Sequence, residues 1–173
     1  MINKALEILS SFAKTIPDAY IGPDRTNYIM EQSEKLSVED KDVLIKFFNH
    51  ILTVMVDRTA SDIEIGGPGT ANYIWFRIQG IKQRVKDLPN LKLDESTMLI
   101  AALLNKNQHR HLMVNRNIDF SYTFRYIKNN VNVRFRADAY FDLDILTLNM
   151  RAISSNLRAL ESYEFHQYAL QSM

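Results

Sequence analysis

The sequence feature that most constrains the fold is a regular alternation of side chains between residues 118 and 152. Apolar or aromatic residues occupy every second position of three successive segments: Ile118, Phe120, Tyr122, Phe124 and Tyr126; Val131, Val133, Phe135, Ala137 and Ala139; Leu146, Leu148, Met150 and Ala152. A period of two places such residues on one face of a β-strand. The intervening "KNN" is typical of a turn. The region therefore predicts three antiparallel strands, each with one apolar face.

A second β-rich region begins at Ser61. The runs "SDIEI" and "NYIWFRIQG" flank the loop-forming "GGPGTA", which predicts a strand, a loop and a strand. A third short strand is expected near Lys82 to Val85. Between the two β regions, Asp94 is expected to cap a helix, and a second short helix should run to about Val114. The apolar positions of the first of these helices are Met98, Ile100, Leu103 and Leu104.

The first 55 residues have helical spacing instead. One helix carries Ile2, Leu6, Leu9, Phe12, Ala13 and Ile16, and we expect Pro17 to stop it. The following "PDAYIGPDRT" is typical of a loop. Ser37 to Asp40, "SVED", is a variant of the capping box and predicts the start of a second helix. Its apolar stripe consists of Val43, Leu44, Phe47, Phe48, Ile51, Leu52 and Met55, which we interpret as core.

These elements together predict an α+β domain with a largely antiparallel sheet and helices on one face, preceded by a helical N-terminal extension. The length of 173 residues fits about one domain. The chain has no cysteine, which excludes disulfides, thiol catalysis and the usual zinc sites. The net charge of +1 gives no field that favours nucleic acid or anionic lipid. Neither a signal peptide nor a membrane-spanning apolar run is recognisable, so we expect a cytoplasmic location without membrane insertion.

The stretch "RTASDIEIGGPG" joins an acidic pair to a glycine-rich turn. A Walker-type phosphate loop needs G-x-x-x-x-G-K-[ST] leading into a helix, whereas this turn lacks the lysine and leads into a strand. Asp62 and Glu64 alternate with isoleucines, so both are expected on the solvent face of a strand. No third oxygen ligand stands nearby in the sequence, and we therefore expect no metal site.

Other candidate chemistry is sparse. His109 and His111 are two residues apart, a spacing that places them on different faces of a helix, and a polar surface is the favoured interpretation. The aromatics near Arg125, Arg134 and Arg136 could form a platform for single-stranded nucleic acid. Because they alternate in register, however, they are better explained as core. No self-contained active site is recognisable, so no enzyme activity is expected of this chain alone.

A set of short motifs resembles the N-terminal domain of the type II secretion and type IV pilus ATPases, and most closely that of the twitching-motility retraction ATPases. The motifs occur in family order over Val56 to Ile153: A-S-D-I, R-I-x-G, a two-helix stretch, D-F-S-Y, R-F-R and M-R-A-I. The resemblance implies a PAS-like α+β domain at residues 56–153. Residues 1–55 are then a helical extension, and residues 154–173 a linker or helix leading towards a motor core.

The resemblance also implies a role for two arginines. In that family this domain packs against the motor core of a neighbouring subunit in a hexamer and supplies arginines to the nucleotide bound there. Those arginines correspond to Arg136, in R-F-R, and Arg151, in M-R-A-I. ATP and Mg²⁺ would belong to the parent motor, with no cofactor in this chain. Its further partners would be the inner-membrane platform proteins of the pilus or secretion machine, so the domain would lie at the periphery of that membrane.

Several features differ from the family pattern. Glu64 stands where the family usually has histidine, and "FDLDIL" replaces a basic arginine-glycine segment. The residues up to about Asp40 have no counterpart in the short retraction ATPases. The printed sequence contains no Walker motif, so it is either part of a longer motor protein or a natural stand-alone domain, and by itself it should not hydrolyse ATP.

Two alternatives remain open. The chain could be a stand-alone PAS-like module that binds a small ligand or another protein, in which case a buried pocket with converging polar groups is expected. Arg136 and Arg151 could equally be surface arginines in ion pairs with Asp138 or Asp144.

Overall fold

The three alternating segments form the three longest strands of the protein. In the computed structural model, which describes residues 1–153, these strands are β4 (Asn117–Tyr126), β5 (Val131–Asp142) and β6 (Ile145–Ile153). They pair antiparallel in the order β6-β5-β4. Phe135, Ala137 and Leu148 are at most 1% exposed on the shared apolar face. The predicted strands and their inward faces are confirmed.

The β-rich region after Ser61 completes the sheet on the other side of β6. It forms β1 (Asp62–Gly66), β2 (Trp75–Ile78) and β3 (Ile81–Arg84), with the 3₁₀ turn η1 (Pro68–Thr70) between the first two. The resulting six-stranded sheet has the order β3-β2-β1-β6-β5-β4, and all of its neighbours run antiparallel. The α+β class with an antiparallel sheet is therefore confirmed.

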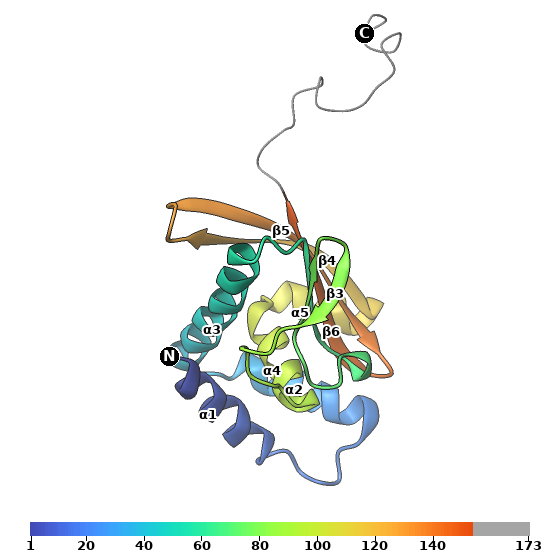
Figure 1. Ribbon diagram of the computed structural model, residues 1–173. Helices are drawn as coiled ribbons and strands as arrows, with labels where there is room; N and C mark the ends of the chain where they lie inside the picture. The colour runs from blue at the N-terminus through green and yellow to red at the C-terminus, as the bar shows by residue number, and fades with distance from the viewer. Residues whose placement is uncertain (154–173) are drawn as a thin grey trace, which may run out of the picture.

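Five α-helices accompany the sheet in the described part of the chain (Figure 1). The helices α1 (Ile2–Ala13), α2 (Gly22–Glu34) and α3 (Val38–Asp57) precede β1, and α4 (Leu93–Leu103) and α5 (Lys106–Asn115) stand between β3 and β4. One continuous hydrophobic core joins all these layers, with members such as Leu9, Phe48, Leu99 and Phe135. The helical front thus shares its core with the sheet. The expected linker at 154–173 lies outside the described residues.

The start of α3 follows its predicted cap. The Ser37 hydroxyl accepts a hydrogen bond from the Asp40 backbone N–H at 3.0 Å, which satisfies one of the free donors at the helix start. Six residues of the expected apolar stripe are fully buried: Leu44, Phe47, Phe48, Ile51, Leu52 and Met55. The interpretation of this stripe as core is confirmed.

Two helix boundaries differ from the prediction. The first helix ends at Ala13 rather than at Pro17. The segment "PDAYIGPDRT" is a loop only at its start, because α2 begins at Gly22 and continues through it. Pro23 stands in the first turn of α2, where its missing N–H has no intrahelical partner to lose. Most residues of this helix are polar. Its buried residues are Thr26, Ile29, Met30 and Ser33.

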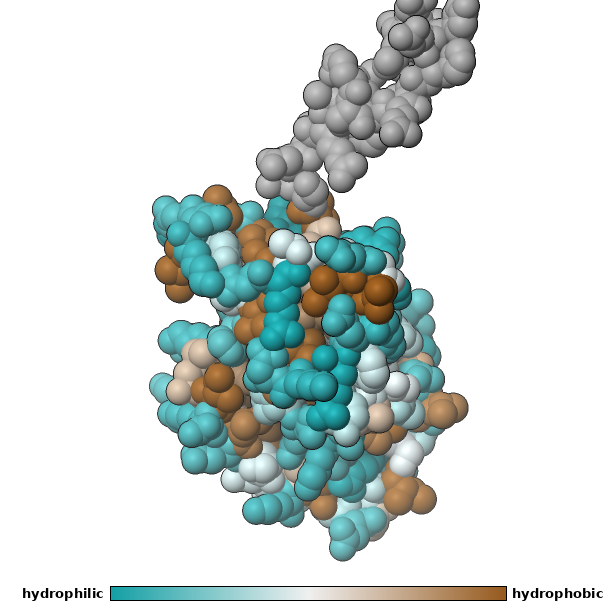
Figure 2. All heavy atoms as spheres, in the orientation of Figure 1, coloured by the Kyte–Doolittle hydropathy of each residue, from teal (hydrophilic) through white to brown (hydrophobic). Residues whose placement is uncertain are grey.

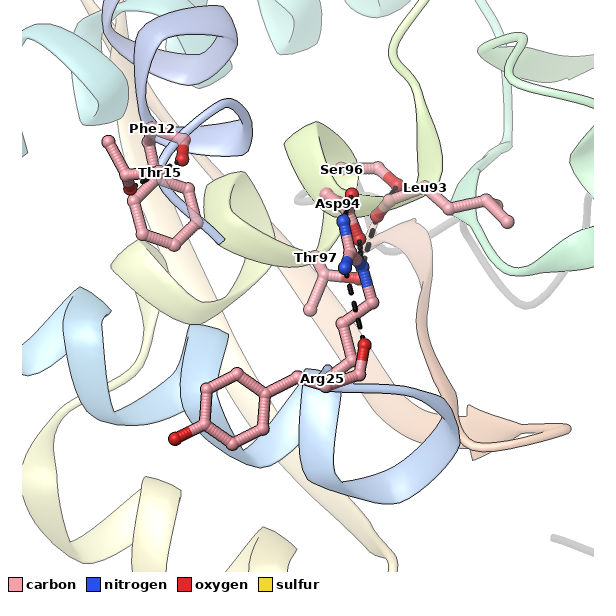
Figure 3. A network of polar contacts seen from close by, with 8 residues as sticks. Phe12, Thr15, Arg25, Leu93, Asp94, Ser96 and Thr97 are labelled. Atoms are coloured by element: carbon pink, nitrogen blue, oxygen red, sulfur yellow. Dashed lines mark hydrogen bonds and ion pairs between the residues drawn. The ribbon is translucent and has the colours of Figure 1, made fainter. Parts of the chain in front are cut away.

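The prediction that Asp94 caps α4 is also wrong. The helix starts at Leu93, and the Glu95 carboxylate accepts the Lys92 backbone N–H at 2.9 Å, so Glu95 satisfies the helix start. Asp94 instead accepts two hydrogen bonds from Arg25 of α2, from Nε at 2.9 Å and from Nη2 at 2.7 Å (Figure 3). This forked contact joins two helices that are far apart in the sequence.

The connection between β5 and β6 is a tight turn. β5 continues to Asp142 and β6 begins at Ile145. Leu143 and Asp144 alone make the turn, both with positive φ, at 46° and 65°. This geometry suits a two-residue hairpin, because its twist matches that of the strands. The two strands therefore stay paired from this turn to the Arg134–Ile153 pair, which fixes the register of the site.

Candidate functional site

Arg136 and Arg151 are direct neighbours on the sheet face that points away from the buried core. They are paired in register across β5 and β6. Their in-sequence neighbours Phe135 and Met150 are at most 2% exposed in the core, so the alternation of each strand turns the arginines outward. The side chains are 72% and 73% exposed. Both arginines therefore lie on the outer face of the sheet.

Each arginine is held by a carboxylate from a different strand. Arg151 Nε donates to Asp62 Oδ1 on β1 at 2.7 Å, and Arg136 Nη2 donates to Asp119 Oδ2 on β4 at 3.1 Å. Arg77 on β2 also faces Asp62, with its Nε 3.7 Å from Oδ2. The expected alternative partners were wrong, because Asp144 instead binds Arg116, and Arg136 contacts Asp119 rather than Asp138. The two arginines on β6 and β5 thus lie between an aspartate on β1 and an aspartate on β4.

The charges on this face shift two carboxyl groups in opposite directions. Burial raises the pKa of Asp62, but the hydrogen bonds from Ser61 and Arg151 and the charges of Arg151 and Arg77 outweigh it, and the net pKa lies below its ordinary value. For Asp138, burial and the nearby Asp119 raise the pKa, and Arg136 only partly offsets them. Asp138 and Asp119 are directly opposite each other in the β4–β5 register. This end of the face therefore carries repelling negative charges beside the two arginines.

The six polar residues at the centre of this face line a shallow hollow of about 300 Å³: Asp62, Asp119, Arg136, Asp138, Asn149 and Arg151. Its ion pairs are exposed, and such pairs contribute little because water and salt screen them. Like charges directly opposite on a sheet repel, and the carboxylates of Asp62 and Asp119 offset this repulsion between the two guanidinium groups. A planar guanidinium matches the oxygens of phosphate or carboxylate. The arrangement is therefore suited to exchanging its own carboxylates for an external anion.

The other sequence candidates do not form a site. Asp62 and Glu64 lie on the outer face of β1 as expected, and Glu64 pairs with Lys82 at 2.6 Å. Among the described residues, no three His, Asp or Glu side chains converge as the ligands of a metal ion would. The glycine-rich turn leads into β2, as the strand–loop–strand prediction required. At Gly66, with φ of 78°, a side chain would collide with the Leu146 carbonyl oxygen.

The predicted polar surface is confirmed for His111 and wrong for His109. His111 is exposed, in agreement with a polar surface, but His109 is buried, with its Nε2 2.8 Å from the Ala101 carbonyl oxygen. Because a carbonyl can only accept, Nε2 carries the proton. His109 thus anchors α5 to α4 and has a structural role. Within residues 1–153, no helix has both the length and the apolar character needed to cross a membrane.

Comparisons with known proteins show what this chain is similar to. No protein-family description matches it, and no curated protein matches its sequence. Among solved structures, it is similar to the pilus retraction motor PilT with bound ADP, at a TM-score of 0.56 and 21% identity over 70% of this chain. It is also similar to the ATPase DotB of Legionella pneumophila, at a TM-score of 0.51 and 20% identity over 91% of this chain.

The aligned share of each chain shows which parts of the proteins are similar. The chain spans only about a third of either neighbour, 33% of PilT and 37% of DotB. Residues 56–173 alone are too few to account for 91% of this chain, so the likeness to DotB extends into the helices that precede β1. The chain therefore shares its fold with one part of PilT and with one part of DotB.

Proposed function

We propose that this chain is the N-terminal assembly and regulatory domain of a hexameric secretion or pilus motor ATPase. In this role it packs on the motor core of a neighbouring subunit and presents Arg136 and Arg151 to the nucleotide there. The observation that carries the proposal is the register pairing of these two arginines on an exposed face, within a fold that is shared with PilT and DotB.

The chemistry of the face supports this role. Phosphoryl transfer builds negative charge on the transferred group, and an arginine supplied from another subunit stabilises that charge. Arg136 and Arg151 extend from adjacent, paired strands of one sheet, so they would move together with this domain. When the domain docks, phosphate oxygens would replace Asp62 and Asp119 as acceptors. ATP and Mg²⁺ would be held by the motor core, and this chain would contribute the arginines.

The packing of the interior favours this proposal over a small-ligand sensory module. The apolar face of the sheet is filled by side chains such as Phe135, Ala139 and Leu148, each at most 1% exposed, and helices cover it. A module that binds its ligand beneath the sheet would need space where these side chains lie. By contrast, the face that carries the arginines is open.

The test uses the motor-containing protein that carries this domain. Arg136→Ala and Arg151→Ala should each reduce ATP turnover strongly, while hexamer formation and the melting temperature stay near those of the unmodified protein. Arg134→Ala is the matched control, since Arg134 is an exposed arginine on the same strand and face. The chain of 173 residues alone should show no turnover. Unchanged turnover in both variants would make the arginines ordinary surface charges, and equal loss in all three would show a general charge effect.

A further inference from the structure

The strand β4 lies at the open edge of the sheet. In the described part of the chain, it pairs with β5 alone among the strands. Figure 1 shows the β4–β5 hairpin extending past the remaining strands, and Figure 2 shows apolar surface at its tip. At that tip Ile127 is 86% exposed and Val131 is 48% exposed. A long edge strand presents unpaired backbone donors and acceptors, which form a template for another strand.

The hydrogen-bond pattern decides which residues of β4 present these groups. The Phe141 backbone N–H donates to the Arg116 carbonyl, just beyond the start of β4, and this pair continues the β4–β5 register. Hydrogen-bonded pairs alternate along an antiparallel ladder, so the even-numbered residues of β4 bond to β5. The odd-numbered residues therefore direct their backbone groups away from the sheet. These residues are Asn117, Asp119, Ser121, Thr123 and Arg125, and all five are exposed.

The sequence of β4 is complementary to itself in the reverse direction. "IDFSYTFRY" has Tyr122 at its centre. Equally spaced on either side are two hydroxyl residues, then two phenylalanines, and then an acid and a base, Asp119 and Arg125. If two copies of β4 run antiparallel with Tyr122 opposite Tyr122, Asp119 of each copy faces Arg125 of the other. We propose that β4 pairs with β4 of a second copy of this chain, about a two-fold axis at Tyr122.

The positions of the outward backbone groups agree with this register. An axis at Tyr122 brings odd-numbered residues opposite odd-numbered residues, and these carry the outward backbone groups. Shifting the axis to Ser121 or Thr123 also brings odd-numbered residues opposite odd-numbered residues. It places Asp119 and Arg125 opposite uncharged residues, however. Opposite charges that face each other across strands stabilise the pairing, and they also select one register. The charges therefore choose among the registers that the backbone allows.

The surroundings of both charged residues leave room for the pairing. Arg125 donates through Nε to Asn130 at 2.8 Å, and Arg136 contacts only the Oδ2 atom of Asp119. Beside Asp119 lies a hollow of about 560 Å³ between β4 and α5, whose lining includes Asn117, Asp138 and His111. The arginine of the second copy would enter this acidic hollow. A two-fold contact is closed, so it joins copies in pairs and does not depend on the motor role.

Sedimentation of the full chain over a wide range of concentrations tests the pairing. The unmodified chain should form a dimer at high concentration. Asp119→Arg alone and Arg125→Asp alone should each weaken the dimer by about tenfold or more, because like charges would then face each other at both ends. An equimolar mixture of these two variants should dimerise again, since both contacts are complementary in the mixed pair. Arg134→Asp is the control, as Arg134 is exposed on β5 rather than at the edge.

A second variant addresses the backbone. Thr123→Pro removes an outward N–H without removing a bond to β5, so it should abolish the dimer while the circular-dichroism melt stays close to that of the unmodified chain. A chain that stays monomeric at every concentration would overturn the proposal. Single charge variants that dimerise like the unmodified chain, a mixture that stays monomeric, or equal weakening by Arg134→Asp would overturn it as well.

Discussion

Arg136 on β5 and Arg151 on β6 stand directly opposite each other, and each is bound by a carboxylate from a strand on its own outer side. Two like charges at one register position would repel, and sheets normally avoid such pairs. Here Asp119 and Asp62 hold the two arginines in place on an open face. The arrangement keeps two guanidinium groups side by side and accessible to an anion.

Replacing the central core residue of β5 should destabilise the fold strongly. Phe135 is fully buried and packs near Phe124, with ring centroids 6.0 Å apart. Phe135→Ala should lower the free energy of unfolding by about 3–5 kcal/mol, because it leaves a cavity in the core. Val131→Ala is a control on the same strand, since Val131 is 48% exposed and should change little. Chemical denaturation measures both, and a change near zero for Phe135→Ala would contradict the assigned core.

The forked contact between Arg25 and Asp94 should stabilise the junction of α2 and α4. Both side chains are partly buried, at 30% and 25% exposure. Asp94→Asn should lower the free energy of unfolding by about 1–2 kcal/mol, since it removes the charge and one acceptor of a bidentate pair. The control is Asp42→Asn, whose partner Lys46 stands one turn away in an exposed pair. It should change the same quantity by less than about 0.5 kcal/mol. Equal effects would show that the first contact is no stronger than a surface pair.

The pH dependence of stability should reveal the raised pKa of Asp138. At neutral pH Asp138 is charged in both states, and the folded state disfavours that charge because of burial and the neighbouring Asp119. Asp138→Asn should therefore raise the melting temperature at pH 7. As pH falls through the raised pKa, the folded protein takes up the proton first and the penalty disappears. The advantage of the variant should thus shrink and vanish below the ordinary value of about 3.9.

Melting curves at a series of pH values measure this difference. Asp142→Asn, on the same strand but opposite the uncharged Ile145, controls for the loss of one negative charge. A stabilising effect of Asp138→Asn that grows as the pH falls would have the wrong sign and would contradict the assignment.

The sheet was predictable because its signal is local. The alternation in β4, β5 and β6 assigns each residue to a face without any knowledge of the partners, so Phe135 and Arg136 could be placed on opposite sides of β5. The helix α2 was missed because its local sequence does not indicate a helix. Its Gly22, Pro23 and Asp24 resemble a turn, and its few apolar positions give a weak helical pattern. Packing against α4 and β6 stabilises this helix, and that packing is not visible in the sequence.

The acids that hold the arginines were not predictable in the same way. Asp62 and Arg151 are separated by 89 positions in the sequence, and they meet only because β1 pairs with β6. That pairing depends on the order of the strands, which alternation alone does not determine. The buried state of His109 was hidden for a similar reason, since its acceptor is a backbone carbonyl on another helix. Side-chain patterns carry no information about such an acceptor.

The most direct test of the proposed role is a subunit-mixing experiment with the motor-containing protein. One variant carries Arg136→Ala and Arg151→Ala with an intact nucleotide site, and the other keeps both arginines but lacks the lysine of its phosphate loop. Each alone should lose turnover, by a factor on the order of 10³–10⁵ for the arginine variant. If the arginines act on the nucleotide of a neighbouring subunit, mixed hexamers should regain turnover, because the second variant supplies arginines to the intact sites of the first. Mixtures as inactive as the separate variants, with mixed hexamers formed, would contradict the proposed role.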